Sequence, residues 1–106
     1  MYRAVEHNPP GVADFFNAVE ANKFVKQDPC LRLAVSLNRT LAGVRYSFKL
    51  FPWRRGWQVA TVSLQPHHGR SKDTPTQNQP DHVSWWSYAG VVRQDAVTEV
   101  NTPDGT

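Results

Sequence analysis

The chain has 106 residues, of which 40% are hydrophobic and 20% are charged, and its formal net charge is +3 at pH 7. This length allows one domain with a modest core, and this composition excludes disordered, collagen-like and coiled-coil proteins. No apolar run approaches the roughly 20 residues of a membrane-spanning helix, and residues 1–10 carry charges and prolines where a signal peptide would be apolar. With Cys30 as the only cysteine in the sequence, we expect a cytoplasmic protein with no membrane partner.

The first half of the chain alternates between predicted strands and predicted helices. Residues 2–6 contain alternating β-forming residues and predict a short strand. Apolar side chains then recur at helical spacing, which predicts an amphipathic helix over residues 12–22. Apolar and polar residues alternate over 31–37 and predict a second strand. A second helix is expected over 39–50, behind a capping asparagine and ahead of a proline that cannot continue it.

The second half of the chain predicts three strands and one long connection. Residues 57–64 carry apolar side chains on both faces, which is typical of a central strand. Residues 65–81 contain three prolines and almost no large apolar side chain, so we expect a functional or mobile loop there. Strands follow over 82–88 and 95–101, and we expect residues 102–106 to form a frayed tail.

These elements predict a single α+β domain over residues 1–101, with two helices packed on a largely antiparallel sheet of about five strands. The expected order along the chain is β-α-β-α-β-β-β. The apolar side chains of the predicted helices and strands should form the core, and those expected to be most buried are Phe15, Phe16, Val35, Leu41, Val44, Phe48, Val59 and Val62.

Short motifs along residues 2–100 resemble those of a group of small bacterial single-domain proteins of unknown function. That group has an aromatic-Arg strand, His-x-Pro-Pro, Asp-Phe, a Leu-Ser-Val strand, an Ala-Arg helix and a late His-x-x-Trp strand. The corresponding residues here are Tyr2 and Arg3, His7 to Pro10, Asp14 and Phe15, Ala34 to Leu37, Val44 and Arg45, and His82 to Trp85. The resemblance implies a free-standing bacterial protein and no particular activity.

Aromatic side chains cluster on the strand predicted over 82–88. Neighbours on a strand point to opposite faces, so we expect one of Trp85 and Trp86 in the core and the other in a pocket or a dimer contact. We therefore expect a non-enzymatic binding protein, whose small-molecule or protein partner occupies a pocket or groove lined by His82, Trp85, Trp86 and Tyr88. The same strand could form the edge of a homodimer.

An enzyme is the alternative interpretation. Arg3, Ser36 and Glu99 lie on three different predicted strands, in an order similar to the Arg-Ser-Glu layout of ADP-ribosyltransferases, which bind NAD across a split sheet. The resemblance implies that Arg3 contacts the cofactor phosphate, that Ser36 supports the nicotinamide pocket and that Glu99 stabilises the ribosyl cation. This interpretation requires the three side chains to converge on one cleft.

A nucleic-acid-binding module is a second alternative. The turn after the second predicted helix holds Trp53, Arg54 and Arg55, a mixture of aromatic and guanidinium groups that can stack on bases and bind phosphates. Residues 1–64 also carry nine basic and four acidic side chains. Because the total charge is modest, we expect no binding of nucleic acid at physiological salt.

The four histidines show neither His-x-His nor His-Glu-x-x-His spacing. His67 and His68 are adjacent in the sequence, and neighbouring side chains on an extended chain point apart. Zinc sites need three or four ligands that converge on one point. We therefore expect no metal site, and the leading interpretation requires no cofactor.

Overall fold

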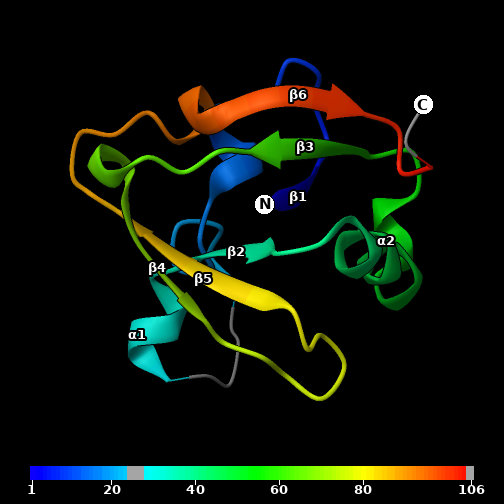
Figure 1. The fold of residues 1–106 in the computed structure, drawn as a ribbon, viewed down its shortest axis with the longest axis horizontal. Helices are drawn as coiled ribbons and strands as arrows, with labels where there is room; N and C mark the ends of the chain where they lie inside the picture. The colour runs from blue at the N-terminus through cyan, green and yellow to red at the C-terminus, as the bar shows by residue number, and fades with distance from the viewer. Residues whose placement is uncertain (24–27, 105–106) are drawn as a thin grey trace.

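The fold is built on one antiparallel sheet, seen in a computed structural model that describes residues 1–23 and 28–104 (Figure 1). The six strands run in the order β4-β5-β2-β1-β3-β6. In chain order they are β1 (Tyr2–Val5), β2 (Val35–Asn38), β3 (Gln58–Val62), β4 (Gly69–Asp73), β5 (His82–Ser87) and β6 (Val97–Asn101). The helical elements are α1 (Pro29–Arg32), α2 (Leu41–Leu50) and the short 3-10 helices η1 (Val12–Phe15), η2 (Pro52–Arg54), η3 (Pro66–His68) and η4 (Arg93–Ala96). The predicted α+β class and the antiparallel sheet are confirmed.

The sheet has six strands where the sequence predicts about five. The additional strand is β4, which lies inside the loop predicted over 65–81 and pairs with β5 along its whole length. Its side chains are polar and mostly exposed, so no apolar alternation marks it in the sequence. Backbone pairing at the edge of the sheet is sufficient to hold such a strand.

The helix predicted over 12–22 is reduced to the single turn η1. Side chains compete there with the helical backbone, because the Asp14 carboxylate accepts hydrogen bonds from the backbone N–H groups of Glu6 and Gly11. Asn17 and Glu20 likewise exchange hydrogen bonds between their side chains and each other's backbone N–H groups. Such bonds stabilise turns at the expense of helix.

The strand predicted over 31–37 begins later, at Val35, because α1 occupies its first part. Asp28 caps this helix by accepting a hydrogen bond from the backbone N–H of Cys30, and Pro29 stands at its first position. Both residues are favourable at the start of a helix. Local capping therefore overrides the alternation that predicted an extended chain.

The second predicted helix is confirmed as α2, although Thr40 and not Asn38 caps it. The helix covers one face of the sheet, where Val44 lies buried with Ala4 and Val59. It ends at Leu50, ahead of the proline that was expected to stop it.

The opposite face of the sheet holds the larger apolar cluster. Its buried members are Val5, Phe15, Val35, Leu37, Ala60, Val62, Val83, Trp85 and Ala96. The rings of Phe15 and Trp85 meet edge to face, with centroids 6.4 Å apart. Of the predicted core residues, Phe15, Val35, Val44, Val59 and Val62 are buried, whereas Phe16, Leu41 and Phe48 are half-buried.

The sheet parts in its middle, between β1 and β2. β1 pairs with β3 over all four of its residues, but it pairs with β2 only at Tyr2 and Asn38. Beyond that pair the two strands diverge, and the sheet consists of the halves β4-β5-β2 and β1-β3-β6, which lie in the lower and upper parts of Figure 1. A parting of this kind leaves room for side chains and for a ligand.

Candidate functional site

A pocket of about 270 Å³ opens where β1 and β2 part, and we call it the Arg3 pocket. Its walls come from β1, β2, α1, the segment after α2, the β4–β5 connection and β5. The lining residues are Arg3, Ala4, Leu31, Ser36, Asn38, Phe51, Arg54, Thr74, Thr76, Gln79, His82 and Ser84. Among the described residues that line it there are two arginines and no aspartate or glutamate.

Arg3 bridges the parting with its guanidinium group. Nε donates to the carbonyl of Asp14 at 2.7 Å, Nη1 donates to the carbonyl of Ser36 at 2.6 Å, and Nη2 donates to the carbonyl of Phe16 at 3.4 Å. The bond to Ser36 connects β1 to β2 beyond the Tyr2–Asn38 pair, and the other two connect β1 to η1 and to the residue that follows it. The guanidinium also lies 5.5 Å from the centroid of the Phe15 ring.

The charge of Arg3 is compensated only in part. Burial lowers the pKa of Arg3 to about 10; the positive charges of Arg54 and Arg93 act in the same direction, and the Asp14 carboxylate acts against them. Arg3 therefore keeps its proton at neutral pH, although its three hydrogen bonds go to neutral carbonyl groups. An anion bound near this guanidinium would stabilise its buried positive charge.

Arg54 lines the same pocket, and aromatic rings hold its guanidinium. Its guanidinium lies 4.6 Å from the centroid of Phe51 and 5.8 Å from that of Trp57, and Nη1 donates to Oγ of Ser47 at 3.0 Å. Nε is buried and has no hydrogen-bond partner among the described residues. Burial lowers the pKa of Arg54 as well.

Two other arginines, Arg39 and Arg93, contact carboxylates, whereas the two arginines of the pocket do not. Arg39 forms an ion pair with Asp73 at 3.0 Å, and Arg93 forms one with Glu20 at 2.5 Å. Within the described part of the chain, neither Arg3 nor Arg54 has such a partner. Two half-buried guanidinium groups thus share one hollow without an acidic side chain in contact, and this arrangement attracts anions.

Hydroxyl and imidazole groups form the far wall of the pocket. Thr74 Oγ1 lies 2.9 Å from Nδ1 of His82 and 2.7 Å from Oγ of Ser84. Burial lowers the pKa of His82, against smaller opposing effects from Thr74 and Asp81. The imidazole is therefore neutral at pH 7, and this wall offers hydrogen bonds without charge.

The four aromatic and histidine residues predicted to line a pocket do not lie together. Alternation along β5 places His82 in the Arg3 pocket and Trp85 in the core on the opposite face, where Nε1 of Trp85 donates to the carbonyl of His68. Trp86 donates through Nε1 to the carbonyl of Cys30. Tyr88 is 47% exposed, and its hydroxyl accepts a hydrogen bond from Arg70.

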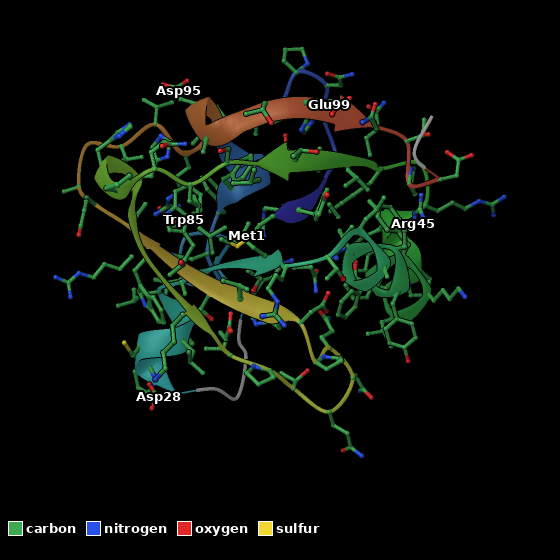
Figure 2. All side chains as sticks on the ribbon, viewed as in Figure 1. Met1, Asp28, Arg45, Trp85, Asp95 and Glu99 are labelled. Carbon is green, nitrogen blue, oxygen red and sulfur yellow. The ribbon has the colours of Figure 1, made fainter. Side chains whose placement is uncertain are left out.

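The structure brings Arg3 and Ser36 together but leaves Glu99 apart. Glu99 is exposed on the outermost strand β6, where it pairs with Thr61 of β3, and both β3 and β1 lie between β6 and β2. Figure 2 shows Glu99 along β6, far from the β5 residue Trp85. The three side chains therefore do not converge on one cleft, because the last strand joins the sheet at its far edge.

The basic turn divides between two environments. Arg54 points into the Arg3 pocket, whereas Trp53 and Arg55 are exposed. The adjacent histidines also have a local role, since Nδ1 of His68 accepts a hydrogen bond from the backbone N–H of Gln65. Over the described ranges, no group of three or more His, Cys, Asp or Glu side chains is arranged to hold a metal ion.

Sequence reasoning missed the polar wall of the Arg3 pocket. Asn38, Thr74, Gln79 and Ser84 belong to β2, to β5 and to the connection between β4 and β5. The only signal in the sequence is that Ser84 follows His82 by two residues on a predicted strand, which places both side chains on one face. Asn38 ends β2, and the positions of Thr74 and Gln79 depend on the path of the connection between β4 and β5.

Comparisons of the chain with protein-family models, with curated proteins and with solved structures find no match. In the part of the chain that the structure describes, no helix has the length and apolar character needed to cross a membrane.

Proposed function

We propose that the protein binds a small phosphate-bearing molecule in the Arg3 pocket. The observation that carries this proposal is the pair of half-buried guanidinium groups, Arg3 and Arg54, with no carboxylate in contact among the described residues. Burying an uncompensated charge is costly, and a bound anion removes that cost. Arginine binds phosphate through paired N–H groups, and the neutral donors on the opposite wall suit the remaining polar groups of such a ligand.

The test measures thermal stabilisation by ribose 5-phosphate and by inorganic phosphate. We expect both to raise the melting temperature of the native protein and of Arg39→Gln, whose arginine pairs with Asp73 outside the pocket. We expect Arg54→Gln to lose the stabilisation, because it removes one of the two charges that would bind the phosphate. The variant should still fold, because Arg54 contacts Ser47 and two rings but does not bridge strands. The absence of stabilisation in the native protein, or an equal effect in Arg54→Gln, would refute the proposal.

A NAD-using enzyme is the second candidate, because Arg3 and Ser36 meet in one pocket and NAD also carries phosphate. Glu99 lies on β6, away from this pocket. A carboxylate that stabilises a ribosyl cation would therefore have to come from a second substrate or from a residue that does not line the pocket. We expect NAD to bind without being consumed. Consumption of NAD by the native protein, with Arg54→Gln inactive and Glu99→Gln unaffected, would favour the enzyme.

The cytoplasm and a homodimer remain predictions. Cys30 is exposed and free, which suits a reducing compartment. β5, the strand expected to form the edge of a homodimer, lies between β4 and β2 and is not an edge of the sheet. A second copy would instead pack on exposed apolar side chains, Tyr88 and Val92 among them. Light scattering coupled to size-exclusion chromatography measures the mass in solution and decides between a monomer and a dimer.

A further inference from the structure

Two smaller hollows adjoin the Arg3 pocket and share its two guanidinium groups. One has a volume of about 120 Å³ and the other of about 220 Å³, and both are lined by Arg3 and Arg54. A phosphate held between these arginines therefore lies at a junction, from which the rest of the ligand can extend in more than one direction. The smaller hollow, which we call the Trp53 hollow, has the exposed Trp53 and the half-buried Trp57 in its wall.

Trp53 offers an open aromatic surface to this hollow. Its side chain is 61% exposed and belongs to neither apolar cluster of the core. The neighbouring ring of Phe51 supports it, with centroids 5.0 Å apart and planes inclined by 40°. Trp53 directly precedes Arg54 in η2, and both residues line this hollow. An exposed tryptophan next to a phosphate site is a stacking platform for a base.

The charges around the Trp53 hollow determine which part of a ligand it suits. Glu6 and Asp14 lie in its wall together with Lys23. The two carboxylates make this hollow less favourable for a phosphate than the Arg3 pocket, which has the same two arginines and no carboxylate in its lining, whereas an uncharged ring is compatible with them. The phosphate is therefore expected at the guanidinium pair and the ring against Trp53.

We infer that the phosphate-bearing ligand is a nucleotide whose base stacks on Trp53. The inference rests on the proposed function, because it uses the same guanidinium pair for the phosphate. Base stacking on an aromatic side chain is tolerant of base identity, so the inference covers the nucleotide class and not one base. A stacked base is expected to tighten binding on the order of tenfold relative to the sugar phosphate alone.

The experiment compares AMP and UMP with ribose 5-phosphate by calorimetric titration. We expect each nucleotide to bind about tenfold more tightly than ribose 5-phosphate. Trp53→Ala should abolish this difference and leave the affinity for ribose 5-phosphate unchanged, whereas Trp53→Phe should keep part of it. The matched control is Tyr88→Ala, which removes a half-exposed aromatic ring on another surface and should change nothing.

The outcomes separate the two proposals. Equal affinity for AMP and ribose 5-phosphate would overturn the stacking inference and leave the phosphate site intact. If ribose 5-phosphate, inorganic phosphate and the nucleotides all fail to bind, both proposals fall. Tighter binding of a single-stranded oligonucleotide than of AMP, lost in Arg55→Ala, would overturn the free nucleotide in favour of nucleic acid. If folded Trp53→Ala still binds AMP more tightly than ribose 5-phosphate to the same extent as the native protein, the base does not stack on Trp53 and the inference is wrong.

Discussion

One carboxylate, that of Asp81, fixes the start of α2. It accepts hydrogen bonds from the backbone N–H and the hydroxyl of Thr40 and from the side-chain amide of Asn38. A negative group is favourable at the N-terminus of a helix. Gly43 makes this approach possible, because a Cβ atom at this position would overlap with the Asp81 carboxylate.

We therefore expect Gly43→Ala to destabilise the protein by about 1–3 kcal/mol. Helix propensity alone predicts the opposite, since alanine is favoured over glycine by about 1 kcal/mol inside a helix. Urea unfolding followed by circular dichroism measures the difference in the free energy of unfolding. A higher free energy of unfolding for Gly43→Ala than for the native protein would contradict this prediction, because it would mean that the Asp81 side chain moves aside without loss of stability.

Gly11→Ala is the matched control for this substitution. The nearest atom to a Cβ at Gly11 would be Oδ2 of Asp14, at 3.9 Å, which is an ordinary contact. The expected change is within about 0.5 kcal/mol, as for substitutions that create no clash.

At the scale of elements, the sequence predicts those whose stability comes from apolar burial. β3, β5 and α2 bury apolar side chains at the period of their backbone, and each lies close to its predicted range. β4 and η1 depend instead on edge pairing and on side-chain hydrogen bonds to the backbone, which leave no periodic pattern. For the same reason Arg3 and Ser36 could be grouped from strand alternation, whereas the wall formed by the β4–β5 connection could not.

The two faces of the sheet should differ in their sensitivity to truncation. Phe15 is fully buried against Trp85, whereas Phe48 is a half-buried residue of α2 that packs against the smaller cluster. Phe15→Ala should cost about 3–5 kcal/mol, because it leaves a cavity in the larger cluster. Phe48→Ala should cost less, because solvent already reaches its ring. Chemical denaturation of both variants tests the ranking, and an equal or larger loss in Phe48→Ala contradicts it.

For the molecule as a whole, stability should fall in acid. Burial alone would raise the pKa of Asp14, but hydrogen bonds from Gly11, Glu6 and His7 outweigh it and lower the pKa below 3.8. Asp81 behaves in the same way through its bonds to Thr40 and Asn38. A carboxyl group whose pKa is lower in the folded state stabilises the fold above its unfolded pKa, and this contribution is lost as the pH falls through the folded value.

We therefore expect the free energy of unfolding to decrease below about pH 4, as measured by urea titrations between pH 6 and pH 2.5. Asp14→Asn should lower the free energy of unfolding by about 1–3 kcal/mol at neutral pH, because the Asp14 carboxylate accepts hydrogen bonds from three backbone N–H groups, those of Glu6, His7 and Gly11. It should also show a shallower acid dependence. Asp95→Asn, at an exposed position of η4, serves as the control, and we expect it to behave like the native protein. A parallel pH dependence for native protein and Asp14→Asn would exclude Asp14 as a source of the acid sensitivity.

The parting between β1 and β2 has a consequence for native-state hydrogen exchange. The two halves of the sheet share one apolar core, so they unfold together, but the residue pair Tyr2–Asn38 and the guanidinium of Arg3 are the described links between β1 and β2. Backbone amides that flank the parting should therefore exchange with deuterium through local opening, faster than amides in the continuous β1–β3 ladder. An anion bound between Arg3 and Arg54 would connect the two halves and slow that exchange. Deuterium uptake by these amides would therefore detect ligand binding without an assay for any reaction of the ligand.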